Sequence, residues 1–294
     1  MSEKPPSPWD KAAIRSADAR KQENTGRRRE AAPAGAERPA VVRQEASRHE
    51  SGNKQELRYY GLNAVQAVFA QRPQAIRKVY LSEARIPQLQ PLLAWCVKQR
   101  IGYRVVEESD LGKLAASSHH EGVVADVLRV EPQALSDWLG ALPAGPVLAL
   151  WLDGVGNPHN FGAILRSAAH FGVAAILQSR DSTLAVSGAA ARVAEGAAEV
   201  VPFVRMGRGD NAIAQLRGAG FGLAATVVRD GAGLFGHELP QRLVYVLGSE
   251  REGMDPALAA ACDLRLSIPG NDAVESLNVA AATAVFLAEW ARRR

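Results

Sequence analysis

The sequence predicts an α/β protein whose second half is a parallel β-sheet with helices on both faces. From Val147 onward, short apolar segments of strand length alternate regularly with amphipathic segments of helical spacing, which is typical of such sheets. Residues 57–131 show a shorter alternation of the same kind. A chain of 294 residues has room for two domains, so we expect a small α/β domain followed by a larger one.

The first 56 residues differ from the rest. They hold 12 Lys and Arg against 9 Asp and Glu, with abundant Pro, Ala and Gly and a single aromatic residue, Trp9. Such a segment buries too little apolar surface to offset the entropy lost on ordering. We therefore expect a disordered basic tail over 1–56.

The small domain is expected over 57–131. Helical apolar spacing and short apolar runs predict helices at 64–69, 89–99 and 110–117 and strands at 79–81, 103–106 and 123–130. Pro132 and the Pro143–Pro146 segment then predict a linker over 132–146.

The large domain is expected over 147–294. Its apolar runs predict strands at 147–152, 174–177, 200–204, 221–228, 243–247 and 264–268, and its periodic segments predict helices at 160–171, 188–198, 211–217, 256–261 and 276–292. Ligands of parallel sheets bind in loops beyond the carboxyl ends of strands. The loops after Leu152, Leu247 and Ile268 are therefore the places to look for chemistry.

Composition excludes several classes of protein. Cys96 and Cys262 alone form no disulfide framework and no zinc-ligand spacing, which favours a reducing, cytoplasmic setting. The N-terminus has no signal-peptide pattern, and no apolar run approaches the length of a membrane span. His119 and His120 are adjacent and share no helix face, so we expect no metal site.

The first loop, Asp153–Arg166, is glycine-rich and opens a helix. It fails the dinucleotide-binding fingerprint, because His159 stands where the third glycine would fall, and the chain has no P-loop motif. Asn160 is a candidate helix N-cap. Arg166, near a helix N-terminus, is a natural partner for a phosphate.

The other two loops also carry polar groups at strand ends. In the second, Gly248 and Gly253 allow close backbone approach to a ligand, and Glu250 can accept hydrogen bonds or transfer a proton. In the third, Ser276 and Asn278 stand where a helix begins, and each alone would be read as an ordinary helix cap.

Taken together and in order, the loops resemble three motifs of the SpoU (TrmH-type) family of RNA 2′-O-ribose methyltransferases, in the SPOUT superfamily. The N-x-G-x-x-x-R motif is matched by Asn160, Gly162 and Arg166. The G-x-E-x-x-G motif is matched by Gly248, Glu250 and Gly253. The I-P…S-L-N motif is matched by Ile268, Pro269, Ser276, Leu277 and Asn278. Residues 57–130 also resemble the family's substrate-binding domain, at Gly61–Val65 and His120–Val123.

The resemblance implies a C-terminal trefoil knot, a homodimer, an RNA substrate (ribosomal or transfer) and S-adenosylmethionine as cofactor. It implies that the cofactor is bound by Gly248, Ile268, Pro269, Leu277 and Asn278. It implies a catalytic cluster of Asn160, Arg166, Glu250, Ser276 and Asn278, with Arg166 as the base or the phosphate clamp. The chain departs from the family's common residues at Glu121, Gly270, Asp272 and Ala280, and the changes near Pro269 lie beside the expected cofactor loop.

Charge supports a division of labour. Residues 1–56 have a net charge of +3, residues 57–130 of +4, and residues 131–294 of −3. We therefore expect the first 130 residues to capture RNA electrostatically and the second half to supply specific groups.

Three alternatives remain open at this point. A binding module that uses the same fold without catalysis is disfavoured by the presence of Arg166, Glu250 and Asn278. A nicotinamide-dependent oxidoreductase is disfavoured by His159 in place of glycine. A methyltransferase of the open-sheet class would not end in the third-loop sequence.

Overall fold

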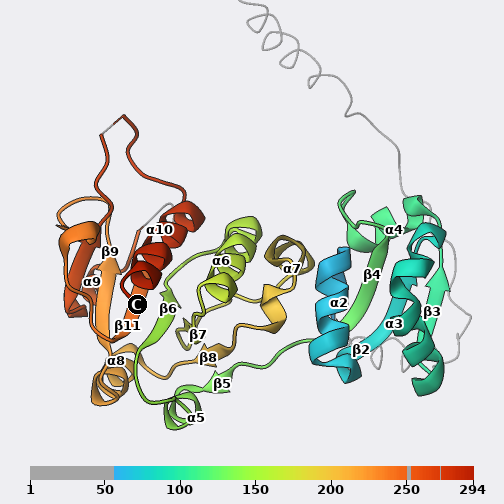
Figure 1. Ribbon diagram of the computed structural model, residues 1–294, viewed down its shortest axis with the longest axis horizontal. Helices are drawn as coiled ribbons and strands as arrows, with labels where there is room; N and C mark the ends of the chain where they lie inside the picture. The colour runs from blue at the N-terminus through green and yellow to red at the C-terminus, as the bar shows by residue number, and fades with distance from the viewer. Residues whose placement is uncertain (1–55, 250–252, 272) are drawn as a thin grey trace, which may run out of the picture. The chain divides into compact units, whose positions relative to one another are not determined.

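The computed structural model describes residues 56–249, 253–271 and 273–294. The tail predicted over 1–56 therefore lies, except for Glu56, outside the described residues. Within them the chain forms two β-sheets, one of four strands and one of eight (Figure 1).

The four-stranded sheet belongs to the small domain and has the order β1-β4-β2-β3. Strands β1 and β2 are antiparallel to β4, and β3 is parallel to β2. Its elements are β1 (Glu56–Tyr60), α2 (Leu62–Gln71), β2 (Ile76–Leu81), α3 (Ile86–Gln99), β3 (Gly102–Val105), α4 (Glu108–Ala115) and β4 (Val123–Leu128). Sequence analysis missed β1, because its two tyrosines directly follow the polar tail.

The eight-stranded sheet has the order β10-β12-β9-β11-β6-β7-β8-β5, and every pair of neighbouring strands is parallel. The predicted α/β fold with a parallel sheet is confirmed. Its strands are β5 (Gln133–Ala134), β6 (Val147–Leu152), β7 (Ala175–Gln178), β8 (Phe203–Arg205), β9 (Gly222–Thr226), β10 (Ala232–Gly233), β11 (Arg242–Leu247) and β12 (Leu264–Ser267). Its helices are α5 (Leu135–Gly140), α6 (Pro158–His170), α7 (Gly188–Ala194), α8 (Gly209–Gly218), α9 (Pro256–Ala261) and α10 (Val279–Arg292).

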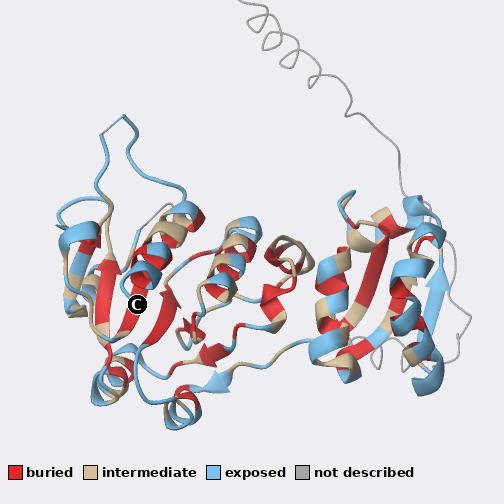
Figure 2. Cartoon of the chain, viewed as in Figure 1, coloured by how far each residue is buried: buried red, intermediate tan, exposed pale blue. Residues whose placement is uncertain are grey.

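The central strand β6 is buried on both faces (Figure 2). Alternate residues along it enter two different apolar clusters: Leu148, Leu150 and Leu152 pack with α6, α7 and α10, whereas Val147, Ala149 and Trp151 pack with α5 and α8. This is why the strand reads as an unbroken apolar run instead of an alternating one. Helices cover both faces, as the sequence predicts.

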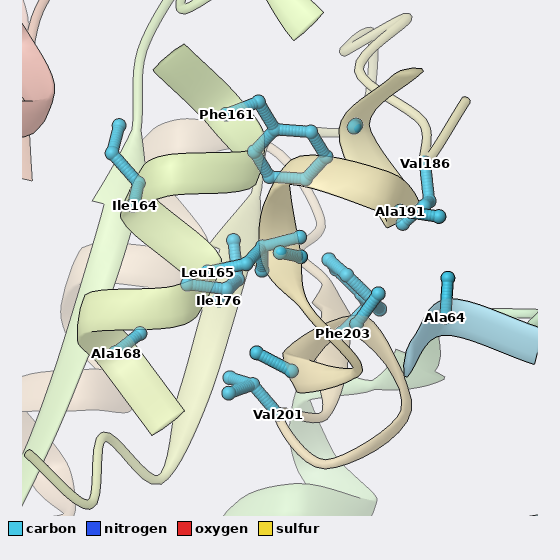
Figure 3. Packing of buried hydrophobic residues seen from close by; sticks show 14 of the residues in the cluster. Ala64, Phe161, Ile164, Leu165, Ala168, Ile176, Val186, Ala191, Val201 and Phe203 are labelled. Carbon is cyan, nitrogen blue, oxygen red and sulfur yellow. The ribbon is translucent and has the colours of Figure 1, made fainter. Parts of the chain in front are cut away.

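The cluster on the first face continues into the small domain. Phe161 of α6 lies beside Phe203 of β8, with ring centroids 6.1 Å apart, and Ala191 of α7 packs in the same cluster as Ala64 of α2 (Figure 3). The backbone of Gly188 approaches β1 so closely that a Cβ there would lie 2.4 Å from the carbonyl oxygen of Arg58. The N-terminus of α7 is thus packed against the small domain.

The segment 132–146, expected to be a linker, is partly ordered into the large sheet. Strand β5 pairs with β8, and Leu135 and Trp138 of α5 are buried against the second face of the sheet. The prolines at both ends of the segment suggested a linker, but its two large apolar side chains outweigh that signal, because burying each removes substantial apolar area from water.

Candidate active site

The first loop leads from β6 into α6 and turns Asn160 toward the C-terminal helix. The N-cap of α6 is Asn157 and not Asn160: its Oδ1 accepts from the backbone N–H of His159 at 2.9 Å and of Asn160 at 3.4 Å. Pro158 occupies the first helical position, where its missing N–H costs nothing. The expectation that Asn160 caps the helix is therefore wrong, and its side chain makes a contact elsewhere.

That contact is with the third loop. Asn278 donates from Nδ2 to Oδ1 of Asn160 at 3.0 Å. The Oδ1 of Asn278 accepts from the backbone N–H groups of Ala280 and Ala281, so Asn278 is the N-cap of α10. Because both ends of the Asn278 amide are engaged, its orientation is fixed, and it ties the starts of α6 and α10 together.

The second loop depends on its two glycines. Ser249 and Gly253 exchange two backbone hydrogen bonds, of 2.8 and 3.1 Å, which hold these two residues of the second loop together. A Cβ on Gly248 would lie 2.4 Å from the backbone nitrogen of Met254, so only glycine fits there. Gly253 has φ +75°, a conformation that favours glycine. Both glycines of the second motif are thus required by backbone geometry.

The first and second loops are joined to each other. Asp153 donates its backbone N–H to the carbonyl of Leu247 at 2.8 Å, and its Oδ2 accepts from the backbone N–H of Asp255 at 3.0 Å. A Cβ on Gly154, at φ +80°, would approach the Cβ of Ser249 to 3.0 Å. These contacts hold the ends of β6 and β11 in one fixed arrangement.

A cleft of about 1150 Å³ opens where the loops meet. Its lining includes seven of the nine residues predicted to bind the cofactor or to form the catalytic cluster: Asn160, Gly248, Ile268, Pro269, Ser276, Leu277 and Asn278. Residues from three strand ends and from both helix starts thus converge on a single space, as expected for the carboxyl edge of a parallel sheet. Glu250 lies outside the described residues, as does Asp272.

Arg166 does not line the cleft. It lies six residues after Asn160 on α6, which corresponds to about 9 Å along the helix axis and about 120° around it. Its side chain is 65% exposed, and its Nη1 lies 4.0 Å from Oε1 of Glu195, directly after α7. Gly162, one turn earlier on the same helix face, explains this placement: a Cβ there would lie 2.5 Å from the carbonyl oxygen of Ala190 in α7, so the two helices touch at this point.

Sequence analysis missed one wall of the cleft. The end of β9 contributes Thr226, Val227 and Val228. Thr226 is held by a 2.9 Å hydrogen bond from its Oγ1 to the carbonyl of Val246. No motif marks this segment, but the rule that ligands bind beyond the carboxyl ends of parallel strands applies to β9 as it does to its neighbours.

The lining of the cleft is mostly uncharged. Among its described residues only Arg265 and Glu275 carry ionisable side chains. Apolar side chains are left open to it, with Leu277 49% exposed and Val274 69% exposed. The described cleft therefore offers backbone polar groups and apolar side chains instead of a charged surface.

This donor set fits an adenosine-containing group such as S-adenosylmethionine. An adenine ring needs apolar contact on its faces and hydrogen bonds at its edge, which Ile268, Leu277 and the loop backbones can provide. The close backbone approach at Gly248 leaves the main chain itself as the wall of the site. No group of His, Cys, Asp and Glu among the described residues could hold a metal ion, and no described helix has the length and apolarity to cross a bilayer.

Comparison with known proteins assigns the family. Residues 147–288 match the SpoU rRNA Methylase family, and residues 59–133 match the RNA 2′-O ribose methyltransferase substrate binding family. The chain belongs to the SpoU family. It is 36% identical over 238 residues to the 23S rRNA (guanosine-2′-O-)-methyltransferase RlmB of Coxiella burnetii, covering 80% of this chain and 95% of that protein.

The chain is also similar to two further proteins. An uncharacterized tRNA/rRNA methyltransferase of Escherichia coli, YfiF, is 37% identical over 239 residues, which cover 81% of this chain and 69% of the relative. The AdoMet-bound rRNA methyltransferase of Sinorhizobium meliloti has the same fold, with a TM-score of 0.67 at 24% identity over 85% of this chain and 90% of the other.

Proposed function

We propose that this chain methylates a ribose 2′-hydroxyl in ribosomal RNA, with S-adenosylmethionine as the methyl donor. The observation that carries the proposal is the convergence of the three motif loops on one cleft, closed by the Asn160–Asn278 hydrogen bond. The RlmB relative, at 36% identity over nearly its full length, supports ribosomal over transfer RNA.

The protein's part in such a reaction is to bind, orient and activate. Bound S-adenosylmethionine supplies a methyl group on a positively charged sulfur, which makes that methyl electrophilic without a metal. A 2′-hydroxyl is a weak nucleophile until its proton leaves, so the site must hold it in line and lower its pKa. Asn160, Ser276 and Asn278 would orient the ribose at the cleft, and Arg166 would bind the neighbouring phosphate.

Arg166 stands outside the cleft of its own chain, which bears on the homodimer. A second copy that placed its own α6 beside this cleft would bring an arginine to it. We infer that the active enzyme is a homodimer with its contacts in the 147–294 domain. We also infer, from membership of the SpoU family, that the C-terminal segment is knotted. Its return from β12, next to the edge strand β10, to α10, which packs on α6, is compatible with such a knot.

The proposed domain layout rests on composition and on the pattern of helices and strands, and the roles of the domains rest on charge. We propose a tail over 1–56, a small RNA-binding domain over 57–131 and a methyltransferase domain over 147–294, acting in the reducing setting of the cytoplasm. The excess of Lys and Arg in the first 130 residues would supply most of the phosphate attraction.

Methyl transfer from radiolabelled S-adenosylmethionine to ribosomal RNA tests the function. RNA from a strain that lacks this protein should accept label at one ribose, mapped by its resistance to alkaline cleavage, and Arg166→Ala should lower the rate roughly 10²-fold or more. Cofactor binding by calorimetry should survive that substitution. Normal cofactor binding with no transfer to any ribosomal or transfer RNA would favour the binding-module alternative.

Mixing two inactive variants tests the dimer. Arg166→Ala and Asn278→Ala disable opposite sides of the proposed composite site. If the arginine comes from the partner copy, each mixed dimer contains one site with both residues intact and one site with both replaced. Activity should then return to at most half of the wild-type value. A monomer in light scattering, or no recovery on mixing, would contradict this arrangement.

A further inference from the structure

Glu195 has a backbone conformation that its side chain disfavours. It is the C-cap of α7, with φ 53° and ψ 39° in the left-handed region. Helices commonly end in this conformation, but with glycine or asparagine, because a Cβ there crowds the backbone. The next residue is Gly196, also left-handed at φ 93°. A glutamate at such a position has a cost, which points to a use for its carboxylate.

The carboxylate reaches two groups. Its Oε1 lies 4.0 Å from Nη1 of Arg166, and its Oε2 accepts a hydrogen bond from Nδ2 of Asn63 in α2 of the small domain. The glutamate side chain is 30% exposed, so it is partly enclosed by these neighbours. Among the described residues, Glu195 is the acidic partner of Arg166, the residue proposed to bind the RNA phosphate.

The position of Glu195 is built into the packing of the two helices. Gly162 brings α6 against α7, and Arg166 lies one turn further on the same face of α6. The C-terminus of α7 therefore falls beside Arg166, and the left-handed turn at Glu195 directs the carboxylate to it. Because φ turns the Cβ about the N–Cα bond, a right-handed φ at residue 195 would start its side chain in a different direction from the same Cα position.

We propose that Glu195 is a positioning residue for methyl transfer: it holds the Arg166 guanidinium in place before the RNA phosphate binds. This rests on the role proposed for Arg166. A partly exposed pair at 4.0 Å contributes little to folding stability, so the benefit of the carboxylate lies in restricting a long, flexible side chain. Asn63 in turn restricts Glu195, which links the small domain to the proposed phosphate clamp.

Two substitutions separate this role from a structural one. Glu195→Gln keeps an oxygen that can accept from Asn63 but removes the charge that holds Arg166. We expect kcat to fall between about tenfold and a hundredfold, while the Kd for RNA does not rise, because a negative charge near the phosphate has been removed. Glu195→Gly also removes the steric cost of a side chain in the left-handed conformation, so we expect the melting temperature to rise by about 2 °C. We expect kcat of this variant to fall as much as in Glu195→Gln.

Ala116→Gly is the matched control. Ala116 is likewise the left-handed C-cap of a helix, α4, with φ 49°, and it is exposed. Its replacement should raise the melting temperature to a similar degree and leave kcat unchanged. A purely structural glutamate would not give a higher melting temperature together with a lower kcat. We expect that combination at residue 195 and not at residue 116.

A third measurement keeps the test independent of the reaction. The Nε–H signal of Arg166 in ¹⁵N NMR, assigned by its loss in Arg166→Lys, should shift and broaden in Glu195→Gln and stay unchanged in Ala116→Gly. An unchanged kcat in Glu195→Gln, or a kcat loss with a parallel fall in melting temperature, would overturn the proposal. A wild-type chain that transfers no methyl group would instead contradict the proposed function, and the NMR comparison would still decide whether Glu195 holds Arg166.

Discussion

Gly248 shows how a single missing side chain shapes the cleft. Its hypothetical Cβ overlaps the backbone of Gly253 and Met254, so Gly248→Ala must push the turn open. We expect S-adenosylmethionine to bind about tenfold more weakly or worse, which corresponds to the cost of forcing one methyl group into packed backbone. Calorimetric titration would measure it.

Gly270 provides the control for that substitution. It lies in the same cleft, but a Cβ there meets nothing within 4 Å and its φ is not positive. Gly270→Ala should therefore bind the cofactor within about twofold of the wild type. Equal affinities for the two alanine variants would show that the turn after β11 does not form the cofactor wall.

Glu289 in α10 makes the free energy of unfolding depend on pH in the acidic range. Its buried carboxylate accepts hydrogen bonds from Arg292 and Arg293, which lower its pKa to about 2. Because this is below the unfolded value of about 4.3, the carboxylate stabilises the fold above that value, and the stabilisation is lost as pH falls through about 2.

Glu289→Gln should remove this dependence. Urea unfolding between pH 2 and pH 7 should show lower stability than the wild type at neutral pH and a difference that closes toward pH 2. The exposed Glu238, changed to Gln, serves as the control and should follow the wild type. A constant difference across the whole range would contradict the lowered pKa.

At the scale of elements, the two asparagines at the start of α6 have separate tasks. Asn157 caps the helix, and Asn160 contacts Asn278. Asn157→Ala should lower the free energy of unfolding by about 1 kcal/mol, the usual cost of losing an N-cap. Denaturant unfolding measures this.

The same pair of variants should separate in activity. Asn160→Ala should lower methyl transfer strongly with a smaller loss of stability, whereas Asn157→Ala should keep most of its activity once folded. The opposite ranking would return the capping role to Asn160.

Sequence patterns predicted most elements for a physical reason. Strands β6 and β11 contain runs of apolar residues, β12 alternates apolar and polar residues, and α9 and α10 begin at ordinary caps. Strand β5 and helix α5 escaped because prolines flank them, and their burial depends on a sheet assembled from distant segments.

The candidate site was also predicted only in part from the sequence. The strand-end rule led to the loops that hold Asn160 and Asn278, because topology alone brings such loops together. It could not place Arg166 outside the cleft or reveal Glu195, since helix packing and a left-handed backbone leave no pattern in the local sequence.

At the scale of the whole molecule, a buried ion pair joins the small domain to the large one. Arg72, after α2, donates to both carboxylate oxygens of Glu199, whose side chain is 2% exposed. Arg72 also donates to the carbonyl of Leu128. Burial and the charge of Glu199 both raise the pKa of the neighbouring Tyr59 hydroxyl, which stays protonated.

Breaking this pair should destabilise the entire chain. Arg72→Ala leaves the Glu199 carboxylate buried without its partner, which typically costs about 3–5 kcal/mol. The double variant Arg72→Leu with Glu199→Leu should recover much of that loss in urea unfolding. If Arg72→Ala alone is nearly neutral, the pair is solvated and does not join the domains.

The strand order of the large sheet also determines when the protein can become functional during synthesis. The central strand β6 is made when about half of the chain has been synthesised, but its neighbour β11 follows about ninety residues later. Helix α10, which packs on the Leu148–Leu152 face of β6, is made after β11. Until then one side of β6 has no partner, and parallel pairings between distant segments form slowly. A nascent chain that stops before α10 would lack Asn278 and would leave one face of its apolar core exposed to water. Premature release would therefore give a fragment that aggregates, and not an enzyme with reduced activity.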